Sequence, residues 1–284
     1  METKIQSIQA KDYSLGKDGI SFIFITDTHL PRNSMHSPYL IRRIMENTNV
    51  RFVINGGDTL DNENTKKAAI DQFYQWRNLM YGIREYNVIG NHDLNTISQT
   101  VEEAKLTRDE FYSVMFREHE ENVVFDGNDH YILDYPSQKI RFIIVSTSFS
   151  ATNSQGTWLK NKMTELSNDW SIIVVTHYFW RDQSTLHSGG EQLITAINEV
   201  YDSLNATFIC IIAGHAHQDI SMTESTKGYL IISTTSDART SESGNPRTIG
   251  TINEHAFDIV YINKNTRTID MIRIGSGIDR NFNY

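Results

Sequence analysis

Short apolar segments alternate with helical patterns along most of this chain, and this alternation constrains its fold. The apolar segments are rich in Ile, Val and Phe, and they span residues 20–26, 50–55, 86–90, 141–147, 171–176 and 207–213. Between two of them, apolar side chains such as Ile70, Phe73 and Trp76 recur at helical spacing. Strands that are apolar on both faces and separated by helices predict an α/β fold, with parallel pairing in the middle of a helix-covered sheet.

Two further regions predict antiparallel strands. Residues 122–135 place the turn residues Asp126, Gly127 and Asn128 between apolar segments, which indicates a hairpin. Residues 252–275 alternate apolar and polar positions on both sides of Asn-Lys-Asn-Thr, which predicts a closing β-hairpin. The chain has no linker-like segment or internal repeat. We therefore predict a single domain over residues 18–284, with residues 1–17 as an N-terminal extension or edge strand, and a long surface loop over residues 235–251.

Composition excludes several classes of protein. Hydrophobic residues make up 39% of the chain and charged residues 21%, as in folded globular proteins. The net charge of −9 argues against nucleic acid as a partner, because a basic surface supplies most of such affinity. The single cysteine, Cys210, lies in an apolar segment and is predicted to be a buried thiol. No apolar segment is long enough for a membrane span, and the N-terminus lacks a signal peptide, so we expect a cytoplasmic protein; its oligomeric state is left open.

Five of the predicted strands end in Asp, Asn or His. The blocks that follow them are Asp27-Thr28-His29, Gly56-Gly57-Asp58, Gly90-Asn91-His92-Asp93, His177 and Gly214-His215-Ala216-His217. Each block alone is typical of a helix cap or a turn. Because the carboxyl ends of strands in an α/β sheet share one edge, the five blocks together predict a single site.

The residue types at these strand ends are those of a metal centre. The candidate ligands combine carboxylate, imidazole and one amide: Asp27, His29, Asp58, Asn91, His177, His215 and His217. A set without thiolate suits a hard or borderline divalent cation such as Mn²⁺, Fe²⁺ or Zn²⁺. There are too many ligands for one tetrahedral zinc, so we expect two metal ions with one carboxylate bridging them. Such a pair assists in-line displacement at phosphorus and lowers the pKa of bound water.

The small residues within the blocks also have predicted roles. Gly57, Gly90 and Gly214 are expected to let the backbone turn sharply without a Cβ. Ala216 separates His215 from His217, and an extended backbone there would send both imidazoles to the same side.

The five ordered blocks, from Asp27 to His217, resemble the signature of calcineurin-like metallophosphoesterases. The resemblance implies a two-sheet α/β sandwich flanked by helices, with a dinuclear metal site at the C-terminal ends of the strands. It implies that one metal is held by Asp27, His29 and His217, that the other is held by Asn91, His177 and His215, and that Asp58 bridges them. It also implies that His92 is a catalytic group that is not a ligand and that Asp93 orients it.

The C-terminal part carries a second similarity. Residues 273–280, Arg-Ile-Gly-Ser-Gly-Ile-Asp-Arg, are similar to the endings of phosphoesterases encoded near tail genes of bacterial viruses and in prophages. This similarity implies a virion-associated location as an alternative to the cytoplasm. The simpler interpretation is the end of a closing hairpin, with Asp279 and Arg280 forming a surface ion pair.

These patterns predict a metallophosphoesterase, a hydrolase that attacks a small-molecule phosphoester, more often a diester, with a metal-bridging hydroxide. The alternatives are a nuclease of the same superfamily, which would need a basic track, and a non-catalytic or virion-associated scaffold that keeps the fold. Manganese is one of the expected metals. Residues in the loops after the first and fourth blocks are candidate substrate contacts, with surface packing as the alternative for each: Arg32, His36, Tyr178, Trp180, Arg181 and His187.

Overall fold

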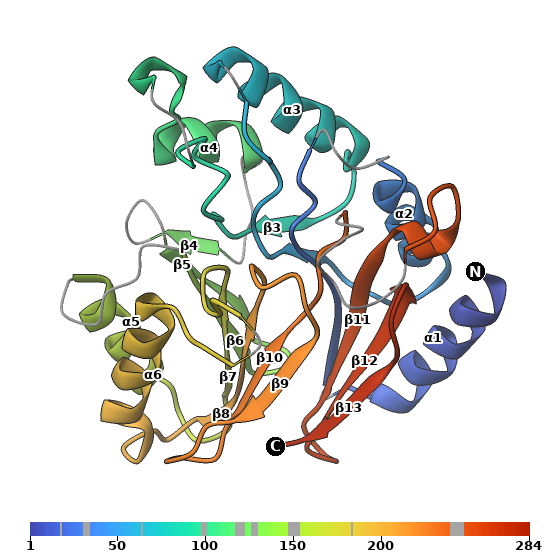
Figure 1. Cartoon of the computed structure of the whole chain (residues 1–284). Helices are drawn as coiled ribbons and strands as arrows, with labels where there is room; N and C mark the ends of the chain where they lie inside the picture. The colour runs from blue at the N-terminus through green and yellow to red at the C-terminus, as the bar shows by residue number, and fades with distance from the viewer. Residues whose placement is uncertain are drawn as a thin grey trace.

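The computed structural model describes residues 1–17, 19–30, 35–63, 65–97, 101–116, 123–125, 130–146, 154–182, 184–238 and 247–284. Over these residues the chain forms two mixed β-sheets that pack face to face, with helices on both outer surfaces (Figure 1). The predicted two-sheet α/β sandwich is therefore confirmed.

The first sheet has the strand order β13-β12-β11-β1-β2-β3. Its strands are β1 (Gly19–Ile25), β2 (Val53–Asn55), β3 (Glu85–Asn87), β11 (Ala256–Asn263), β12 (Thr268–Gly275) and β13 (Arg280–Asn283). β1, β2 and β3 are parallel, whereas β11 is antiparallel to β1 and begins the antiparallel half. β1 is buried along its whole length because both of its faces are apolar.

The second sheet has the order β4-β5-β6-β7-β8-β10-β9. Its strands are β4 (Val123–Phe125), β5 (His130–Tyr135), β6 (Ile140–Val145), β7 (Ser171–Thr176), β8 (Thr207–Ala213), β9 (Ile220–Thr223) and β10 (Leu230–Ser233). β6, β7, β8 and β10 are parallel, and antiparallel strands close both edges. The predicted parallel centre with antiparallel flanks is thus present in the second sheet, whereas in the first sheet the parallel strands form one half and end at the edge strand β3.

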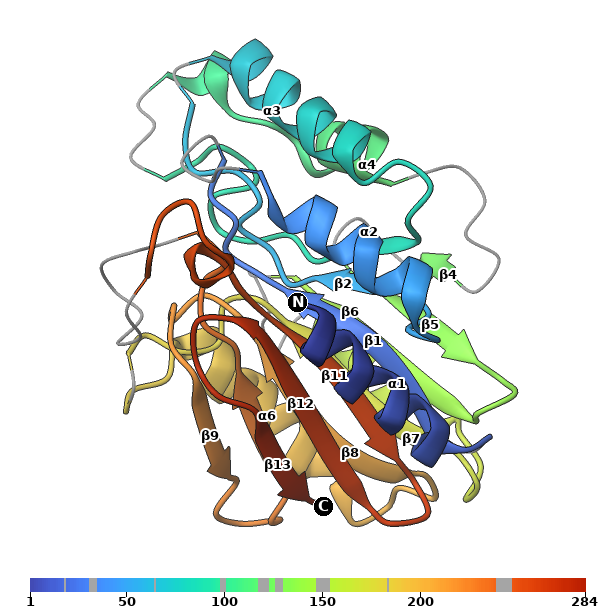
Figure 2. The same ribbon diagram turned by 90° about the vertical axis from the view of Figure 1, so that its right-hand side faces the viewer.

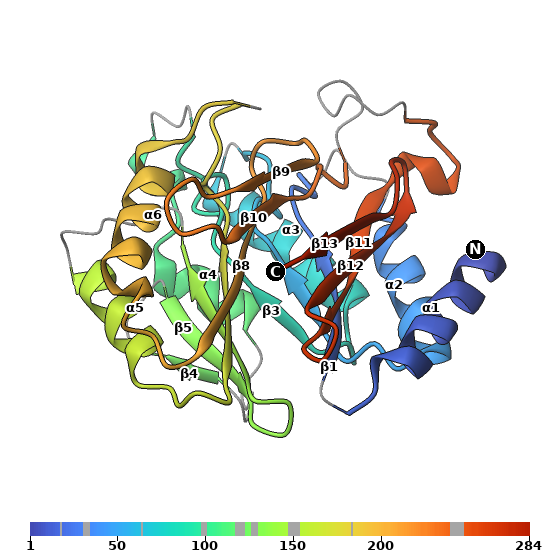
Figure 3. The same ribbon diagram turned by 90° about the horizontal axis from the view of Figure 1, so that it is seen from below.

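Helices cover the outer face of each sheet (Figures 1 and 3). The first sheet is covered by α1 (Glu2–Leu15), α2 (Ser37–Asn47), α3 (Lys66–Leu79) and α4 (Arg108–Met115), and the second by α5 (Ser154–Thr164) and α6 (Ser188–Tyr201). Two short 3-10 turns, η1 (Glu102–Ala104) and η2 (Ile252–Glu254), complete the elements. No helix in these described ranges is long and apolar enough to cross a membrane.

The core between the sheets is built from aromatic and branched side chains. Phe22 of β1 stacks on Phe52 with ring centroids 5.4 Å apart and meets Phe142 of β6 edge to face at 5.2 Å. Such pairs add specificity to apolar burial. Cys210 is buried in this core as a free thiol, as predicted, and burial raises its pKa.

The N-terminal segment is a helix and not a strand. Residues 2–15 form α1, which buries Ile5 and Ile8 and runs beside β11 and β12 (Figure 2). The Tyr261 hydroxyl donates to the Ile8 carbonyl at 3.1 Å, so the helix is tied to β11. Of the two alternatives for residues 1–17, the edge strand is wrong.

The predicted closing hairpin is confirmed as β11 and β12, but it continues into β13, which the sequence did not indicate. The expected ion pair between Asp279 and Arg280 is wrong: Asp279 accepts from Lys4 at 2.7 Å, and Arg280 donates to Asp258 at 2.7 Å. β4 and β5 pair as predicted, while their turn, residues 126–129, lies outside the described residues. Of the predicted loop 235–251, residues 239–246 lie outside them too.

Candidate metal centre

The first two sequence blocks lie side by side because their strands keep pairing beyond β1 and β2. The Asp27 backbone N–H donates to the Gly57 carbonyl at 2.8 Å, and the His29 N–H donates to the Asp58 carbonyl at 3.0 Å. This pairing fixes both carboxylates at the same sheet edge. They are fully buried, as is His29.

Asp27, His29 and His217, three of the predicted ligands, come together, and the two imidazoles face one carboxylate oxygen of Asp27. Its Oδ2 accepts from the Thr26 hydroxyl at 2.8 Å and from the His215 backbone N–H at 3.0 Å. Its Oδ1 lies 3.1 Å from His217 Nε2 and 3.7 Å from His29 Nε2, and these two nitrogens are 3.0 Å apart. The protein thus saturates one oxygen and directs the other at the two imidazoles.

A second cluster forms around Asp58, His177 and His215. His177 Nδ1 donates to the Gly56 carbonyl at 2.7 Å, which presents Nε2 to Asp58 Oδ2 at 3.0 Å. A histidine whose far nitrogen is held in this way has a fixed tautomer and ring orientation, as metal-binding histidines do. His177 Nε2 also lies 3.9 Å from Asp27 Oδ1, so the two clusters adjoin.

The donor atoms of both clusters fit divalent metal ions. Five buried atoms of the candidate ligands have no hydrogen-bond partner among the described residues: Asp27 Oδ1, His29 Nδ1, Asn91 Oδ1, His177 Nε2 and His215 Nδ1. Buried polar atoms without a partner are costly unless something else binds them. Oxygen and imidazole nitrogen without sulfur is the donor set of Mn²⁺, Fe²⁺ or Zn²⁺.

The buried carboxylates of the site also favour a positive charge beside them. Burial alone would favour neutral imidazoles, but the carboxylates of Asp27 and Asp61 raise the pKa of His29 to about 10, and those of Asp58 and Asp27 raise the pKa of His177 to about 9. His215 is different, because burial and the nearby His177 lower its pKa to about 3 and keep it neutral. Neutral imidazole is the form that binds a metal.

Several candidate ligands have a strained backbone. Asp27, His29, Asp58, His215 and His217 have φ values of 54°, 46°, 52°, 70° and 55°. This left-handed region costs a residue with a Cβ about 1–2 kcal/mol, and such strain collects at functional sites. The extended backbone expected around Ala216 is therefore wrong, and His215 and His217 enter different clusters.

The three glycines serve two different purposes. Only Gly57 has a positive φ, 98°, and so allows the predicted turn. A Cβ at Gly90 would lie 2.1 Å from Asp58 Oδ1, and one at Gly214 would lie 2.1 Å from Thr26 Oγ1. These two positions need glycine because the neighbouring chain approaches closely, not because the backbone turns left-handed.

His92 lies beside the clusters and is partly exposed. Its Nδ1 donates to the Asp61 carbonyl at 2.9 Å, and its Nε2 is 3.9 Å from Asp58 Oδ2. Its ring meets that of His29 edge to face, with centroids 5.1 Å apart. One nitrogen is thus anchored to the protein while the other points toward the site.

The expectation that Asp93 orients His92 is wrong. The buried Asp93 carboxylate accepts backbone N–H bonds from Gly90 at 2.7 Å, Thr59 at 2.8 Å, Asp58 at 2.9 Å and Leu60 at 3.2 Å. Burial and the charge of Asp58 raise the pKa of Asp93 to about 7, against these donors. Asp93 ties the second block to the third and so positions Asp58.

Sequence reasoning missed Asp61, which contacts two histidines of the site. Its Oδ1 lies 3.5 Å from His29 Nδ1 and 3.7 Å from His92 Nδ1. The signal was weak, because Asp61 follows the second block by only three residues in a segment that reads as a loop. Thr235 and Ser236 were also missed; their hydroxyls donate to the carbonyls of His217 and Asp27 at 2.7 and 2.8 Å.

Comparison with known families agrees with this geometry. The model of the calcineurin-like phosphoesterases matches residues 20–219, which include all five blocks. This chain belongs to the calcineurin-like phosphoesterase family. It is therefore a metal-dependent hydrolase of phosphoester bonds, with candidate sites for two divalent metal ions. The match ends before the C-terminal strands, so their similarity to virus-encoded members stays a prediction.

Solved structures show the same fold at low sequence identity. A dimetal phosphatase from Danio rerio is 17% identical with a TM-score of 0.67, over 93% of this chain and 99% of that one. A purple acid phosphatase from yellow lupin (Lupinus luteus) is 13% identical with a TM-score of 0.61, and NAD nucleotidase from Haemophilus influenzae is 11% identical with a TM-score of 0.51. This chain covers 53% and 50% of the latter two. No curated protein matches the sequence.

In this calcineurin-like phosphoesterase, two of the predicted substrate contacts adjoin the metal centre. Tyr178 and His187 stack with centroids 3.8 Å apart, and Tyr178 lies 4.5 Å from the His215 ring. His187 Nε2 is 3.1 Å from His215 Nε2. Together Tyr178 and His187 form an aromatic wall beside the second cluster.

The other candidates are placed elsewhere. Trp180 is wrong as a pocket wall, because only 2% of it is exposed and it packs on Phe179 in the core under α6. Arg181 is exposed. Burial of His187 is the main cause that lowers its pKa, and the positive charge of Arg181 lowers it further. His36 lies near His255 in a different cavity and is not brought to the ligands. Arg32 lies outside the described residues.

A buried ion cluster links the C-terminal hairpin to the fifth block of this phosphoesterase. Arg273, 1% exposed, donates to Asp219 at 2.6 and 2.9 Å and to Asp258 at 2.9 and 3.0 Å. Asp219 follows His217 by two residues, and its Oδ1 also accepts from the Thr235 N–H at 3.1 Å. β12 thereby anchors the loop that carries His215 and His217.

Proposed function

We propose that this protein hydrolyses small-molecule phosphodiesters, with two divalent metal ions in the clusters described above. Asp27, His29 and His217 would hold one ion, and Asn91, His177 and His215 would hold the other, with Asp58 shared between them. The adjoining clusters and their buried, unpartnered atoms support this assignment. When bound, two such cations provide positive charge for phosphate oxygens and acidify water.

The single observation that carries the proposed reaction is the position of His92. Its Nδ1 is held by the Asp61 carbonyl, so Nε2 is directed toward Asp58 and the phosphate that the clusters would bind. A protonated Nε2 would give its proton to the oxygen of the departing alcohol. Proton transfer of this kind by a positioned histidine contributes about 10²–10⁴-fold to the rate.

The preference for diesters rests on the two flanks of the site. His92 lies near Asp58, and the aromatic wall of Tyr178 and His187 lies near His215, which belongs to the same cluster as Asp58. A diester has two organic substituents, one leaving beside His92 and one remaining for the aromatic wall. A monoester would leave that wall without a contact.

The test is hydrolysis of bis-p-nitrophenyl phosphate and p-nitrophenyl phosphate by the purified protein with Mn²⁺, Fe²⁺ or Zn²⁺. We expect faster turnover of the diester, and loss of turnover in both Asp58→Ala and His92→Ala. Metal content separates the two roles, because Asp58→Ala should lose bound metal whereas His92→Ala should retain it. Absence of turnover of any phosphoester with every one of these metals would refute the proposed function.

A further inference from the structure

A second polar cavity lies at the opposite edge of the first sheet from the metal centre. The cavity of about 440 Å³ is lined by Ser21 near the start of β1, by Arg51 just before β2, by Arg84 just before β3 and by Tyr135 at the end of β5. The metal-ligand blocks follow the far ends of β1, β2 and β3. β1 has seven residues at about 3.3 Å each, so the two sites are about 20 Å apart.

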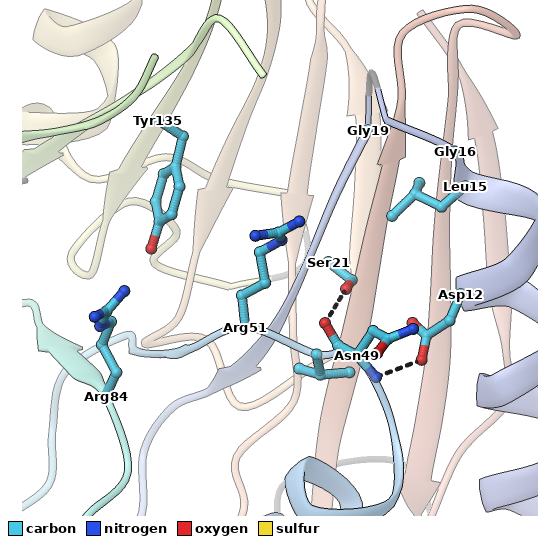
Figure 4. Close-up of a pocket in the computed structure, with 10 residues that line it drawn as sticks. Asp12, Leu15, Gly16, Gly19, Ser21, Asn49, Arg51, Arg84 and Tyr135 are labelled. Carbon is cyan, nitrogen blue, oxygen red and sulfur yellow. Dashed lines mark hydrogen bonds between the residues drawn. The ribbon is translucent and has the colours of Figure 1, made fainter. Parts of the chain in front are cut away.

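One end of this cavity gathers hydrogen-bond donors. Figure 4 shows the guanidinium groups of Arg51 and Arg84 at the same end of the cavity as the Tyr135 hydroxyl. Tyr135 is 7% exposed, and its hydroxyl has no aligned hydrogen-bond partner among the described residues, although Tyr86 and Arg84 lie close to it. A buried hydroxyl without an aligned partner, in a cavity that two guanidinium groups also line, indicates a place for an acceptor that carries negative charge.

The donors are held in place by the fold. The Arg51 backbone N–H donates to the Ser21 carbonyl at 3.2 Å, and the Arg84 carbonyl accepts from Val53 at 2.9 Å, so both arginines leave fixed points of the sheet. The Tyr135 ring stacks on Phe52 with centroids 4.8 Å apart and an interplanar angle of 13°, which fixes its hydroxyl. No carboxylate of the described residues forms an ion pair with Arg51.

The one acidic lining residue lies at the other end of the cavity. Figure 4 shows Asp12 beside Asn49, away from Arg84 and Tyr135. Its Oδ2 accepts from the Asn49 N–H at 2.7 Å and its Oδ1 accepts from the Tyr261 hydroxyl at 3.0 Å. Both oxygens of Asp12 are therefore engaged within the fold, at the end of the cavity away from Arg84 and Tyr135.

We propose that this cavity binds a phosphate group, either free phosphate or the phosphoryl end of a small molecule, through Arg51, Arg84 and the Tyr135 hydroxyl. Guanidinium groups match the geometry of phosphate oxygens better than any other side chain. Arg51 and Arg84 are exposed to solvent, so the ligand reaches them without an opening of the fold. The site is separate from the metal centre and does not depend on it.

The experiment is calorimetric titration of inorganic phosphate into the metal-loaded protein and into the Asp58→Ala variant, whose metal centre is disabled. We expect phosphate binding at this cavity to remain in Asp58→Ala. The Kd for phosphate should rise at least about tenfold in Arg51→Gln, and at least about tenfold in the separate variant Arg84→Gln. Arg43→Gln, which removes an exposed arginine that pairs with Glu2 and does not line the cavity, is the matched control and should leave the Kd unchanged.

Glycerol 2-phosphate in the Asp58→Ala background distinguishes the two sources of the phosphate group. Tighter binding of glycerol 2-phosphate than of phosphate points to a phosphorylated small molecule, and the reverse order points to free phosphate; either result supports the site. Absence of any phosphate binding in Asp58→Ala would overturn the proposal, as would equal weakening by Arg43→Gln. A site that binds phosphate while the protein lacks phosphoesterase activity would refute only the proposed function.

Discussion

Asp61 shows how a residue outside the sequence blocks can set the properties of the metal centre. Its carboxylate lies 3.5 Å from His29 Nδ1, and its carbonyl accepts from His92 Nδ1 at 2.9 Å. A carboxylate behind a metal-binding histidine fixes the ring and raises the basicity of the nitrogen that binds the metal. Asp61 thus connects a candidate ligand to the candidate proton donor.

We predict that Asp61→Asn weakens metal binding about 10–100-fold, the range found when such supporting carboxylates are removed. The asparagine keeps the shape and the backbone carbonyl, so His92 keeps its anchor while His29 loses the charge behind it. Competition of the protein with a fluorescent chelator for Mn²⁺ measures the effect. Asp71→Asn, an exposed carboxylate paired with Lys67 on α3, is the control. Equal metal affinity in Asp61→Asn and the wild type would contradict this role.

Gly90 tests whether close approach or backbone conformation explains a glycine in the blocks. An added Cβ would lie 2.1 Å from Asp58 Oδ1, so Gly90→Ala should displace that carboxylate and lower phosphoesterase activity at least about 100-fold. In Gly82→Ala the Cβ would have no atom within 4 Å, but the φ of +81° would cost about 1–2 kcal/mol of stability. Activity assays and urea unfolding should therefore separate the two variants. Full activity in Gly90→Ala would show that Asp58 tolerates displacement.

At the scale of elements, the hairpin of β11 and β12 supports the metal centre through one buried arginine. Arg273→Met would leave Asp258 and Asp219 without their main partner, and breaking a buried ion pair costs about 3–5 kcal/mol. We expect that loss in urea unfolding, together with weaker Mn²⁺ binding because the loop of His217 is released. Arg267→Met, in the turn of the same hairpin, removes an exposed contact with Tyr284 and should cost far less.

The same cluster makes a pH-dependent contribution to stability. Burial alone would raise the pKa of Asp258, but Arg273 and Arg280 hold it well below its usual value. A depressed carboxyl pKa stabilises the fold above the unfolded value of about 3.9, and the contribution is lost as the pH falls below it. The difference in unfolding free energy between wild type and Arg273→Met should therefore shrink as the pH falls from about 4 to about 3. A difference that stays constant over this range would contradict the ionised pair.

The apolar segments predicted the central strands because buried parallel strands need side chains of one kind on both faces. β13, with the residues Arg-Asn-Phe-Asn, was not predictable in this way, since it joins the sheet through backbone pairing with β12. β10 is only four residues long and gives a weak signal. The hydrophobic pattern of the sequence indicates which segments are buried in the core, but it does not indicate edge strands that carry polar side chains.

The candidate ligands could be chosen from sequence because strand ends converge, yet their conformations could not. His215 and His217 have left-handed φ values, and their backbones are bound by residues distant in the chain: the His215 N–H donates to Asp27, and the His217 carbonyl accepts from the Thr235 hydroxyl. The burial of Arg273 likewise depends on Asp219, 54 residues away. The family resemblance assigned Asp93 to orienting His92, whereas its carboxylate accepts hydrogen bonds from four backbone N–H groups.

At the scale of the whole molecule, the metal centre joins the two sheets. Asp27 and Asp58 follow strands of the first sheet, and His177 and His215 follow strands of the second. The sheets also share one apolar core, in which Phe22 and Phe52 meet Phe142. Neither sheet can bury this face alone, which supports the proposal of a single domain over residues 18–284.

We predict that both sheets unfold in one transition and that Mn²⁺ shifts both equally. Trp76 reports on α3 over the first sheet and Trp158 on α5 over the second, so variants in which one of these is the only one of the four tryptophans retained follow each sheet by fluorescence. Coincident urea midpoints are expected, because the shared core couples the layers. At about 100 times its Kd, each bound Mn²⁺ ion should add about 2.7 kcal/mol to the unfolding free energy seen by both probes. Stabilisation confined to one probe would show that the ions bind a single sheet and do not join the two.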